Sequence, residues 1–414
     1  MSSIIEDVMA RKVYNSRGQE TIEVDIVTAS GFGSAAAPAG ASKGKAEVVS
    51  YPDGGVDEAI RRVEELISPE LVGMDAEDQN DIDALLHEID GTDNFCNIGG
   101  NTAFAISVAN AEAAATSYEL PLFQYLSGYL GNELPFPLGN VLGGGKHALG
   151  KTTDIQEYLV IPLNACCFAD AAKENIMVHE KIGVMLRKAD PNFTGGRGDE
   201  GAWAPNIKNE EALKIVVKAC EEVSDEMEVE CRACLDVAAS SFWNSKEKVY
   251  FYSMEGKKRD SGEQMEFILR LIEEYNLAYV EDPFHEEDFE SFAELTRKVD
   301  NCLICGDDLF VTNRDRLAKG IEMGACNSLI VKTNQIGTLT DAWETTRLAK
   351  WAGYVPVMSH RSGETVDTQL AHLAVGFSCP IIKSGVANGE RVAKTNELIR
   401  IEENLGNRAQ MAIL

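Results

Sequence analysis

The sequence has few positive charges for its length. Its 414 residues include 38 lysines and arginines against 67 aspartates and glutamates, which gives a formal net charge of −29 at pH 7. A surface of this charge repels the phosphate backbone of nucleic acids and the anionic headgroups of membranes. We therefore predict that neither nucleic acid nor a membrane surface is a partner, and that a small anionic ligand binds only in a locally basic pocket.

Long hydrophobic runs are also missing. The sequence contains no apolar run of about eighteen residues, the length at which a helix becomes a candidate to span a bilayer. Near its start, Glu6 and Asp7 occupy the place where a signal peptide needs its apolar stretch. The ten cysteines do not follow the pattern of a small disulfide-rich domain. These absences predict a soluble, cytoplasmic protein with reduced thiols.

Motifs for nucleotides and zinc are absent as well. The glycines Gly143–Gly145 lack the lysine and serine of a phosphate-binding loop, and no G-x-G-x-x-G follows the first predicted strand of either region. Two cysteine pairs lie in apolar runs typical of strands, where residues three apart point to opposite faces and cannot chelate one ion. These pairs are Cys231 with Cys234 and Cys302 with Cys305.

Residues 1–135 have the pattern of an α+β capping domain. The stretch 20–28 alternates polar with β-branched residues, which predicts an antiparallel sheet with one wet face. Residues 34–55 contain four glycines and two prolines with little apolar periodicity, so we expect a loop there. Apolar residues three or four apart predict three helices, at 57–67, 78–89 and 101–118.

Residues 136–414 repeat a shorter pattern. Apolar runs with a polar or charged residue at one end alternate with stretches long enough for one helix. The first run opens with Glu157, and later runs close at Asp236, Glu281, Asp307, Lys332, His360 and Lys383. From Glu281 onward these ends are about 25 residues apart, the length of one strand, one helix and two loops. The pattern predicts a β/α barrel, and the missing dinucleotide motif argues against an open doubly wound sheet.

Three acidic residues close three successive strands of this predicted barrel, namely Asp236, Glu281 and Asp307. The carboxyl ends of barrel strands converge on one mouth. Three like charges there need a compensating cation, and rigid carboxylates that leave room for water or substrate suit Mg²⁺ better than zinc. The sequence therefore predicts a magnesium site.

Two lysines, Lys332 and Lys383, end later strands at the same mouth, and a His-Arg-Ser run at 360–362 lies between them. Neighbouring cations and a metal lower the pKa of a lysine. A neutral lysine can remove the proton beside a metal-bound carboxylate, while the metal stabilises the enolate that forms. The pattern favours proton abstraction next to a carboxylate.

Short motifs follow one another along nearly the whole chain. In order they are NSRG (15–18), GAS (40–42), DGT (90–92), QE (156–157), GDEG (198–201), LDVAAS (235–240), VEDPF (280–284), GDDL (306–309), VKTNQIG (331–337) and SHRSGET (359–365). They resemble the enolase (phosphopyruvate hydratase) family. The resemblance implies a TIM-like barrel with an N-terminal α+β cap. It also implies a Mg²⁺-dependent lyase of glycolysis that dehydrates 2-phosphoglycerate to phosphoenolpyruvate.

The resemblance also implies roles for the matching residues. Asp236, Glu281 and Asp307 resemble the ligands of a first Mg²⁺, and Ser42 resembles a ligand of a second. Lys332 resembles the base that takes the proton from carbon 2 of the substrate. Glu200 resembles the acid that protonates the leaving hydroxyl, and Glu157 resembles the residue that helps it. His147 resembles the histidine of a closing loop, and Lys383 resembles the cation that faces the substrate carboxylate. Substrate contacts correspond to Gln156, His360, Arg361 and Ser362, besides Lys383.

The loops that close over the substrate depart from the family pattern. Lys43 and Lys146 stand where enolases have threonine and serine, and residues 384–391 lack the usual basic-serine stretch. These departures leave open an enolase-like paralogue acting on a different, more anionic 2-phospho or 2-hydroxy acid. A non-catalytic binding or scaffold homologue is a third alternative. Enolases usually pair through both domains, so the resemblance implies a homodimer or a multiple of dimers.

Overall fold

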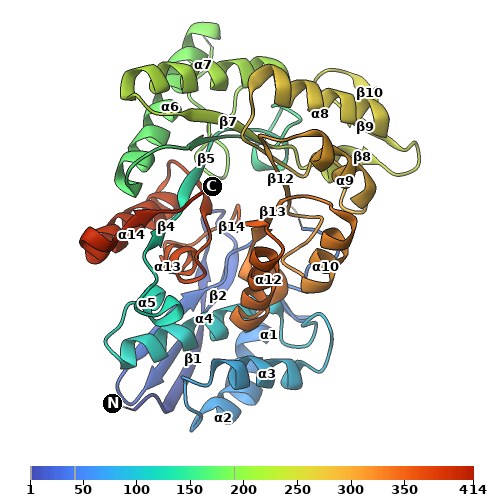
Figure 1. The fold of residues 1–414 in the computed structure, drawn as a ribbon. Coiled ribbons are helices and arrows are strands. Elements are labelled where there is room, and N and C mark those ends of the chain that lie inside the picture. Colours follow the sequence, from blue (N-terminus) through green and yellow to red (C-terminus); the bar gives the residue numbers. More distant parts are fainter. Residues whose placement is uncertain (1, 42, 191) are drawn as a thin grey trace.

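The chain folds into an N-terminal α+β region, in blue in Figure 1, and a C-terminal barrel with helices around it. The structure is a computed structural model, and it describes every residue except 1, 42 and 191. This architecture confirms the fold class predicted from the sequence. The domain boundary between residues 135 and 136 stays a prediction. No helix among the described residues is both long and apolar enough to cross a membrane.

Three antiparallel strands form the N-terminal sheet, as the alternating pattern predicted. In spatial order they are β1 (Ile5–Tyr14), β2 (Glu20–Thr28) and β3 (Phe32–Ala36). Ile22, Val24 and Ile26 of β2 are buried, and the nearly wholly buried helix α4 (Gly100–Ser117) contacts β2 and β3. The other helices here are α1 (Gly55–Arg62), the π-helix η1 (Val63–Ile67), α2 (Ser68–Leu71), α3 (Gln79–Asp90) and α5 (Leu122–Ser127). The three predicted helices are thus confirmed within a few residues.

Eight strands close the barrel. In chain order they are β5 (Phe136–Gly143), β6 (Glu157–Pro162), β7 (Cys231–Asp236), β11 (Tyr279–Glu281), β12 (Leu303–Gly306), β13 (Ser328–Val331), β14 (Val355–Ser359) and β15 (Ile381–Gly385). Two small sheets lie outside it. They consist of β4 (Glu133–Leu134) with β16 (Gln410–Met411), and of β8 (Trp243–Asn244), β9 (Val249–Tyr252) and β10 (Lys257–Arg259).

Helices cover the outside of the barrel, as Figure 1 shows. The long ones are α6 (Phe168–Ala189), α7 (Asn209–Met227), α8 (Ser261–Tyr275), α9 (Phe289–Lys298), α10 (Arg314–Met323), α12 (Leu339–Trp351), α13 (Gln369–Gly376) and α14 (Gly389–Leu405). The short ones are α11 (Thr333–Ile336), η2 (Gly145–His147), η3 (Ala239–Phe242) and η4 (Gly406–Arg408). The long helices pack apolar residues inward, and α14 buries two cations, Arg391 and Lys394, as well.

One strand breaks the repeat of strand and helix that the sequence predicted. Strand β6 runs antiparallel to both β5 and β7. An antiparallel pair needs no crossover helix, so residues 144–156 connect β5 to β6 as a loop with one turn of 3₁₀ helix. The reversal places the first residue of β6, Glu157, opposite Asp236, the last residue of β7. Glu157 therefore lies at the same mouth as the other strand ends.

The N-terminal region meets the barrel at this mouth. Ala39 and Gly363 exchange two backbone hydrogen bonds of 2.7 Å, and the amide of Asn334 donates to the carbonyl oxygen of Pro38 at 3.0 Å. The loop after β3 is thus attached to the loops after β13 and β14. This contact closes one side of the mouth.

Candidate active site

The charged groups at the mouth sit one layer above an apolar barrel interior. That interior includes Leu159, Cys234, Tyr279, Cys305, Ile330 and Ile381. On each strand, the residue two positions closer to the mouth is charged. In the same order as the apolar residues, these are Glu157, Asp236, Glu281, Asp307, Lys332 and Lys383. Residues two apart on a strand point to the same face, so each of these charged groups points into the mouth. The cysteines Cys231 and Cys302 belong to a different apolar cluster from Cys234 and Cys305, which agrees with the same alternation.

A cavity of about 20 Å³ lies at the mouth. Its lining includes all the predicted catalytic and substrate-binding residues, namely Lys332, Glu200, Glu157, Lys383, His147, Gln156, His360, Arg361 and Ser362. Of the predicted metal ligands, Asp236 and Asp307 line it, and Glu281 is fully buried. Ser42 lies outside the described residues, although residues 40–41 just before it line the cavity.

Lys383 holds several carboxylates of the mouth together. Its Nζ atom lies 3.0 Å from Asp236 Oδ2, 2.7 Å from Glu281 Oε2 and 3.3 Å from Glu157 Oε2. Burial disfavours the charged ammonium, but these carboxylates outweigh it and raise the pKa of Lys383 well above its ordinary value. Lys383 therefore stays a cation, suited to hold an anionic group rather than to remove a proton.

Lys332 pairs with the third strand-end carboxylate. Its Nζ donates to Asp307 Oδ2, and the amide of Gln335 donates to Asp307 Oδ1 at 2.9 Å. Burial lowers the pKa of Lys332, as does the nearby charge of Arg361, but Asp307 outweighs both and the pKa is raised. The sequence argument expected neighbouring cations and a metal together to lower this pKa. The contact with Asp307, which that argument left out, acts in the opposite direction.

Three sets of ligand atoms among the described residues gather within 4.8 Å, close enough to hold a metal ion. They are Cys166 with Cys167 and Asp170, His147 with Glu157 and Glu200, and Asp282 with Asp307 and Asp308. The predicted trio of Asp236, Glu281 and Asp307 is not among them. Lys383 lies between the first two carboxylates, and Lys332 pairs with the third.

The trio nevertheless fits a hard cation. All its donors are oxygens on rigid elements, the ligand type that Mg²⁺ and Ca²⁺ take. Burial and the charge of Asp236 raise the pKa of Glu281 well above its ordinary value. Such a shift means that these carboxylates repel one another even with a lysine between them, and a divalent cation relieves that repulsion. The mouth therefore holds acidic residues that can bind a metal.

Two glutamates and two histidines form a second charged group at the mouth. His147 Nδ1 lies 3.2 Å from Glu157 Oε1 and 3.5 Å from Glu200 Oε1. His360 Nε2 lies 3.2 Å from Glu200 Oε2, which also accepts a hydrogen bond of 2.9 Å from Asn140. Burial and the charge of Glu200 raise the pKa of Glu157, whereas the contact with His360 and the charges of His147 and Arg391 outweigh burial and lower the pKa of Glu200 well below its usual range. The pKa values of the two neighbouring carboxylates are thus shifted in opposite directions, an arrangement suited to acid catalysis.

The predicted phosphate contacts face the N-terminal loop. Arg361 is buried, and its Nη2 donates to the two carboxylate oxygens of Glu47 at 3.1 and 3.0 Å. Its Nη1 donates to Asn334 Oδ1 at 3.1 Å. Ser362 Oγ accepts a hydrogen bond of 2.6 Å from the backbone amide of Ala41. Glu47 and Asn334 thus fix the position of the guanidinium at the cavity.

Two family models match the chain, one for each region. Residues 132–413 match the enolase C-terminal TIM barrel domain, and residues 5–126 match the enolase N-terminal domain. The chain belongs to the enolase family. This confirms the resemblance carried by the motifs.

Several relatives named Enolase are similar over almost their whole length. The relative from Methanosphaera stadtmanae is 59% identical, with 98% of this chain and 99% of that protein covered. The one from Methanothermobacter thermautotrophicus is 55% identical, with 98% of each covered. The one from Natronomonas pharaonis is 50% identical, with 97% of this chain and all of that protein covered. Identity of this extent does not favour a paralogue with another substrate or a non-catalytic homologue.

The lysines that depart from the enolase pattern stay at the rim. Lys43 is exposed, and its Nζ donates to Ser50 Oγ at 2.8 Å. Lys146 is exposed in the 3₁₀ turn that precedes the buried His147. Neither lysine is among the described residues that line the cavity. The two extra charges therefore give no support to a more anionic substrate.

Three residues that the sequence argument left out contact the site. Glu47 pairs with Arg361, Asn140 with Glu200 and Arg391 with His360. Arg391 had a recognisable signal, because it begins a helix face with spacing three and four that continues through Lys394, Leu398, Ile401 and Leu405. A cation on an apolar helix face predicts a buried partner. Glu47 and Asn140 are single polar residues in a loop and a strand, and no pattern marks them.

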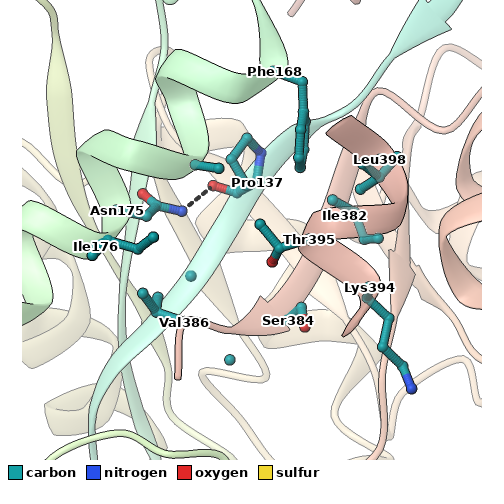
Figure 2. A pocket seen from close by; sticks show the side chains of 13 residues that line it. Pro137, Phe168, Asn175, Ile176, Ile382, Ser384, Val386, Lys394, Thr395 and Leu398 are labelled. Carbon is teal, nitrogen blue, oxygen red and sulfur yellow. Dashed lines mark hydrogen bonds between the residues drawn. The ribbon is translucent and has the colours of Figure 1, made fainter. Parts of the chain in front are cut away.

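A second small cavity, shown in Figure 2, lies on the outer side of β15 between the barrel and helices α6 and α14. Ser384 lines it and follows Lys383 in the strand, so its side chain points away from the mouth. Asn175 also lines it and donates to the carbonyl oxygen of Pro137 at 2.9 Å. No predicted site residue is among its described lining residues. We assign this cavity to the packing between strand and helices.

Proposed function

We propose that the chain catalyses the Mg²⁺-dependent dehydration of 2-phosphoglycerate to phosphoenolpyruvate, a step of glycolysis and gluconeogenesis. The observation that carries this is a single mouth with two chemically different halves. One half joins two lysines to strand-end carboxylates, and the other joins a glutamate pair to two histidines. The first half suits proton removal beside a carboxylate, and the second suits protonation of a leaving hydroxyl.

Asp236, Glu281 and Asp307 would hold a first Mg²⁺, and Ser42 would contribute to a second. Bound there, the ions would supply positive charge beside the substrate carboxylate, where negative charge develops when the carbon-2 proton is removed. The oxygen-only donors and the raised pKa of Glu281 support this assignment. A metal held by Asp307 would compensate the charge of the carboxylate that raises the pKa of Lys332, which would suit this lysine to act as a base.

Lys332 takes the proton from carbon 2, and Lys383, which its carboxylates keep cationic, holds the substrate carboxylate. Glu200 protonates the departing hydroxyl, which leaves as water. Glu157, whose pKa is raised, assists Glu200, and His147 contacts both carboxylates. The remaining substrate contacts are Arg361 and Ser362 for the phosphate, with Gln156 and His360 beside them.

The test is an assay of the purified chain with 2-phosphoglycerate, in which the ultraviolet absorbance of phosphoenolpyruvate reports the rate. We expect turnover with Mg²⁺ and none in excess chelator, with activity restored by added Mg²⁺. Turnover of another 2-phospho or 2-hydroxy acid without turnover of 2-phosphoglycerate would overturn the proposed substrate. Full activity in chelator would overturn the proposed metal.

We also propose that the enzyme works in the cytoplasm as a homodimer or a multiple of dimers. The support is the resemblance to enolases, together with exposed apolar side chains such as Tyr14 and Val366 beside one surface hollow. Light scattering coupled to size-exclusion chromatography measures the mass in solution. The mass of a single chain at micromolar concentration would contradict the proposed pairing.

A further inference from the structure

Arg391 lies behind His360, fully buried near the start of α14. Its Nη1 contacts His360 Nδ1 at 2.6 Å and donates to the carbonyl oxygen of Arg361 at 2.7 Å. Its Nη2 donates to the carbonyl oxygen of Ser362 at 2.7 Å. The backbone amide of Gly385 donates to the same Nδ1 at 3.4 Å. One nitrogen of His360 thus faces two groups that can only donate.

These contacts fix the position of the proton on His360. A guanidinium has no acceptor and keeps its charge at every working pH. The ring nitrogen that faces it must accept, so the single proton of the neutral ring is on Nε2, 3.2 Å from Glu200 Oε2. Burial lowers the pKa of His360 to about 4, and the charge of Arg391 acts in the same direction. The imidazole stays neutral and carries its proton on the nitrogen that lies 3.2 Å from Glu200 Oε2, with no hydrogen bond between the two in this structure.

We propose that Arg391 is a positioning residue that holds His360 as the neutral Nε2–H tautomer and so sets the donor in contact with Glu200. The inference rests on the proposed function, in which Glu200 protonates the departing hydroxyl. The other tautomer turns a lone pair toward the carboxylate and repels it. A charged imidazolium stabilises ionised Glu200 and opposes its protonation. The neutral N–H group orients Glu200 without either effect.

The charges around His360 give the sign of the expected change. Glu200 and Glu364 favour the protonated ring, and Arg391 opposes it. In Arg391→Gln the two carboxylates remain and the opposing cation is gone, so the pKa of His360 rises. The glutamine amide can also accept as well as donate, so it no longer selects one tautomer.

Nuclear magnetic resonance of the chain labelled with ¹⁵N-histidine tests this without any turnover. His360→Gln identifies the signals of His360 among the six histidines. In the wild type we expect the Nε2–H tautomer and no titration of this ring around neutral pH. In Arg391→Gln we expect its pKa to rise by one unit or more. An Nδ1–H tautomer in the wild type, or an unchanged titration in the variant, contradicts the proposal.

Kinetics with a matched control separate this role from general support of the fold. Lys394 is a second buried cation on α14, labelled in Figure 2. It donates to the carbonyl oxygens of Thr365 and Asp367 and pairs with Glu364 at 3.0 Å, and among the described residues it makes no contact with His360 itself. We expect Arg391→Gln to lower the rate of dehydration roughly tenfold to a hundredfold, while exchange of the carbon-2 proton with solvent falls far less. Lys394 acts on His360 only through Glu364, so Lys394→Gln should change the ratio of exchange to dehydration far less than Arg391→Gln does.

A double-mutant cycle with His360 provides the decisive outcome. If Arg391 acts through His360, then Arg391→Gln costs less than about twofold in a His360→Gln background. An equal loss in both backgrounds would mean that Arg391 only supports the backbone of residues 361–362, and the proposal is wrong. If Arg391→Gln does not fold, the tautomer of His360 in the wild type still tests the proposal. Arg391→Lys is a second variant, which keeps a charged donor and should therefore keep the Nε2–H tautomer. Absence of 2-phosphoglycerate turnover in the wild type would overturn the proposed function and leave the tautomer measurement intact.

Discussion

Positively charged residues are placed differently in two regions of the site. We call the buried strand ends and the residues just after them the floor of the mouth, and compare them with the loops that lie over it. In the floor, Lys332, Lys383 and Arg361 are largely buried, and each contacts at least one carboxylate. In the loops, Lys43 and Lys146 are exposed, and Lys43 contacts a neutral hydroxyl. The cations of the floor are thus held in place before substrate arrives, whereas those of the loops remain in water.

The difference follows from what solvent does to a charge. An ion pair in a buried site is little screened, and removal of one partner leaves an uncompensated charge that costs several kcal/mol. A contact of an exposed charge is worth about 0 to 1 kcal/mol and weakens further in salt. Substitutions in the floor are therefore expected to have large effects on catalysis, and those in the loops small ones.

The largest effect is expected for the proposed base. Lys332→Ala should lower the exchange of the carbon-2 proton with deuterated water roughly a hundredfold to ten-thousandfold, because it removes the group proposed to take that proton. Glu200→Gln is the matched control, since it should keep the exchange and lose the dehydration. Exchange is measured by mass spectrometry of recovered 2-phosphoglycerate. An equal loss of exchange in both variants contradicts the separation of roles.

A large effect of a different kind is expected for the proposed metal ligands. Asp236→Asn and Glu281→Gln each remove a charged oxygen donor, so activity at ordinary Mg²⁺ should be lost while the fold survives. Lys383 contacts both side chains and keeps at least one carboxylate in each variant. Isothermal titration with Mg²⁺ and circular dichroism measure binding and fold separately. Wild-type activity and Mg²⁺ affinity in both variants would show that these carboxylates are not the ligands.

Salt should change the interactions of exposed charges more than those of the buried charges in the floor. The chain carries a net charge of −29, and at about 1 M salt the Debye length is only about 3 Å, so repulsion between exposed acidic groups is screened. We expect the Tm to rise by several degrees between about 0.1 and 1 M KCl. The same scan in NaCl distinguishes screening from an effect specific to K⁺. A flat or falling Tm in both salts contradicts the expectation.

The sequence predicted the floor well because strand-end chemistry is periodic. The charged residues at 236, 281, 307, 332 and 383 recur at intervals that the barrel imposes, and the apolar residue two positions before each one marks the interior layer. Local pattern and position in the barrel agree at these residues. The antiparallel direction of β6 was not predicted, because a strand has the same alternation in either direction.

The contacts that tune the floor were beyond the sequence argument for a physical reason. The pKa of Lys332 depends on whether Asp307 or a neighbouring cation stands closer, and only the fold decides this. Likewise, Glu47 reaches Arg361 from a loop more than three hundred residues away in the chain. Long-range pairs of this kind have no periodicity, so composition and spacing carry no signal for them.

The smallest effect is expected for the two rim lysines. Lys43→Thr and Lys146→Ser restore the residues that enolases carry, and each removes an exposed charge that does not line the cavity. The loss of such a charge is worth less than about 1 kcal/mol, so kcat/KM for 2-phosphoglycerate should change by less than about fivefold. Lys218→Thr, on the exposed side of α7, makes the same charge change away from the mouth and controls for net charge. A loss of tenfold or more in either rim variant, without one in the control, would mean that these lysines fold inward onto the substrate. In that case the loops share the catalytic work of the floor, and the contrast between the two regions fails.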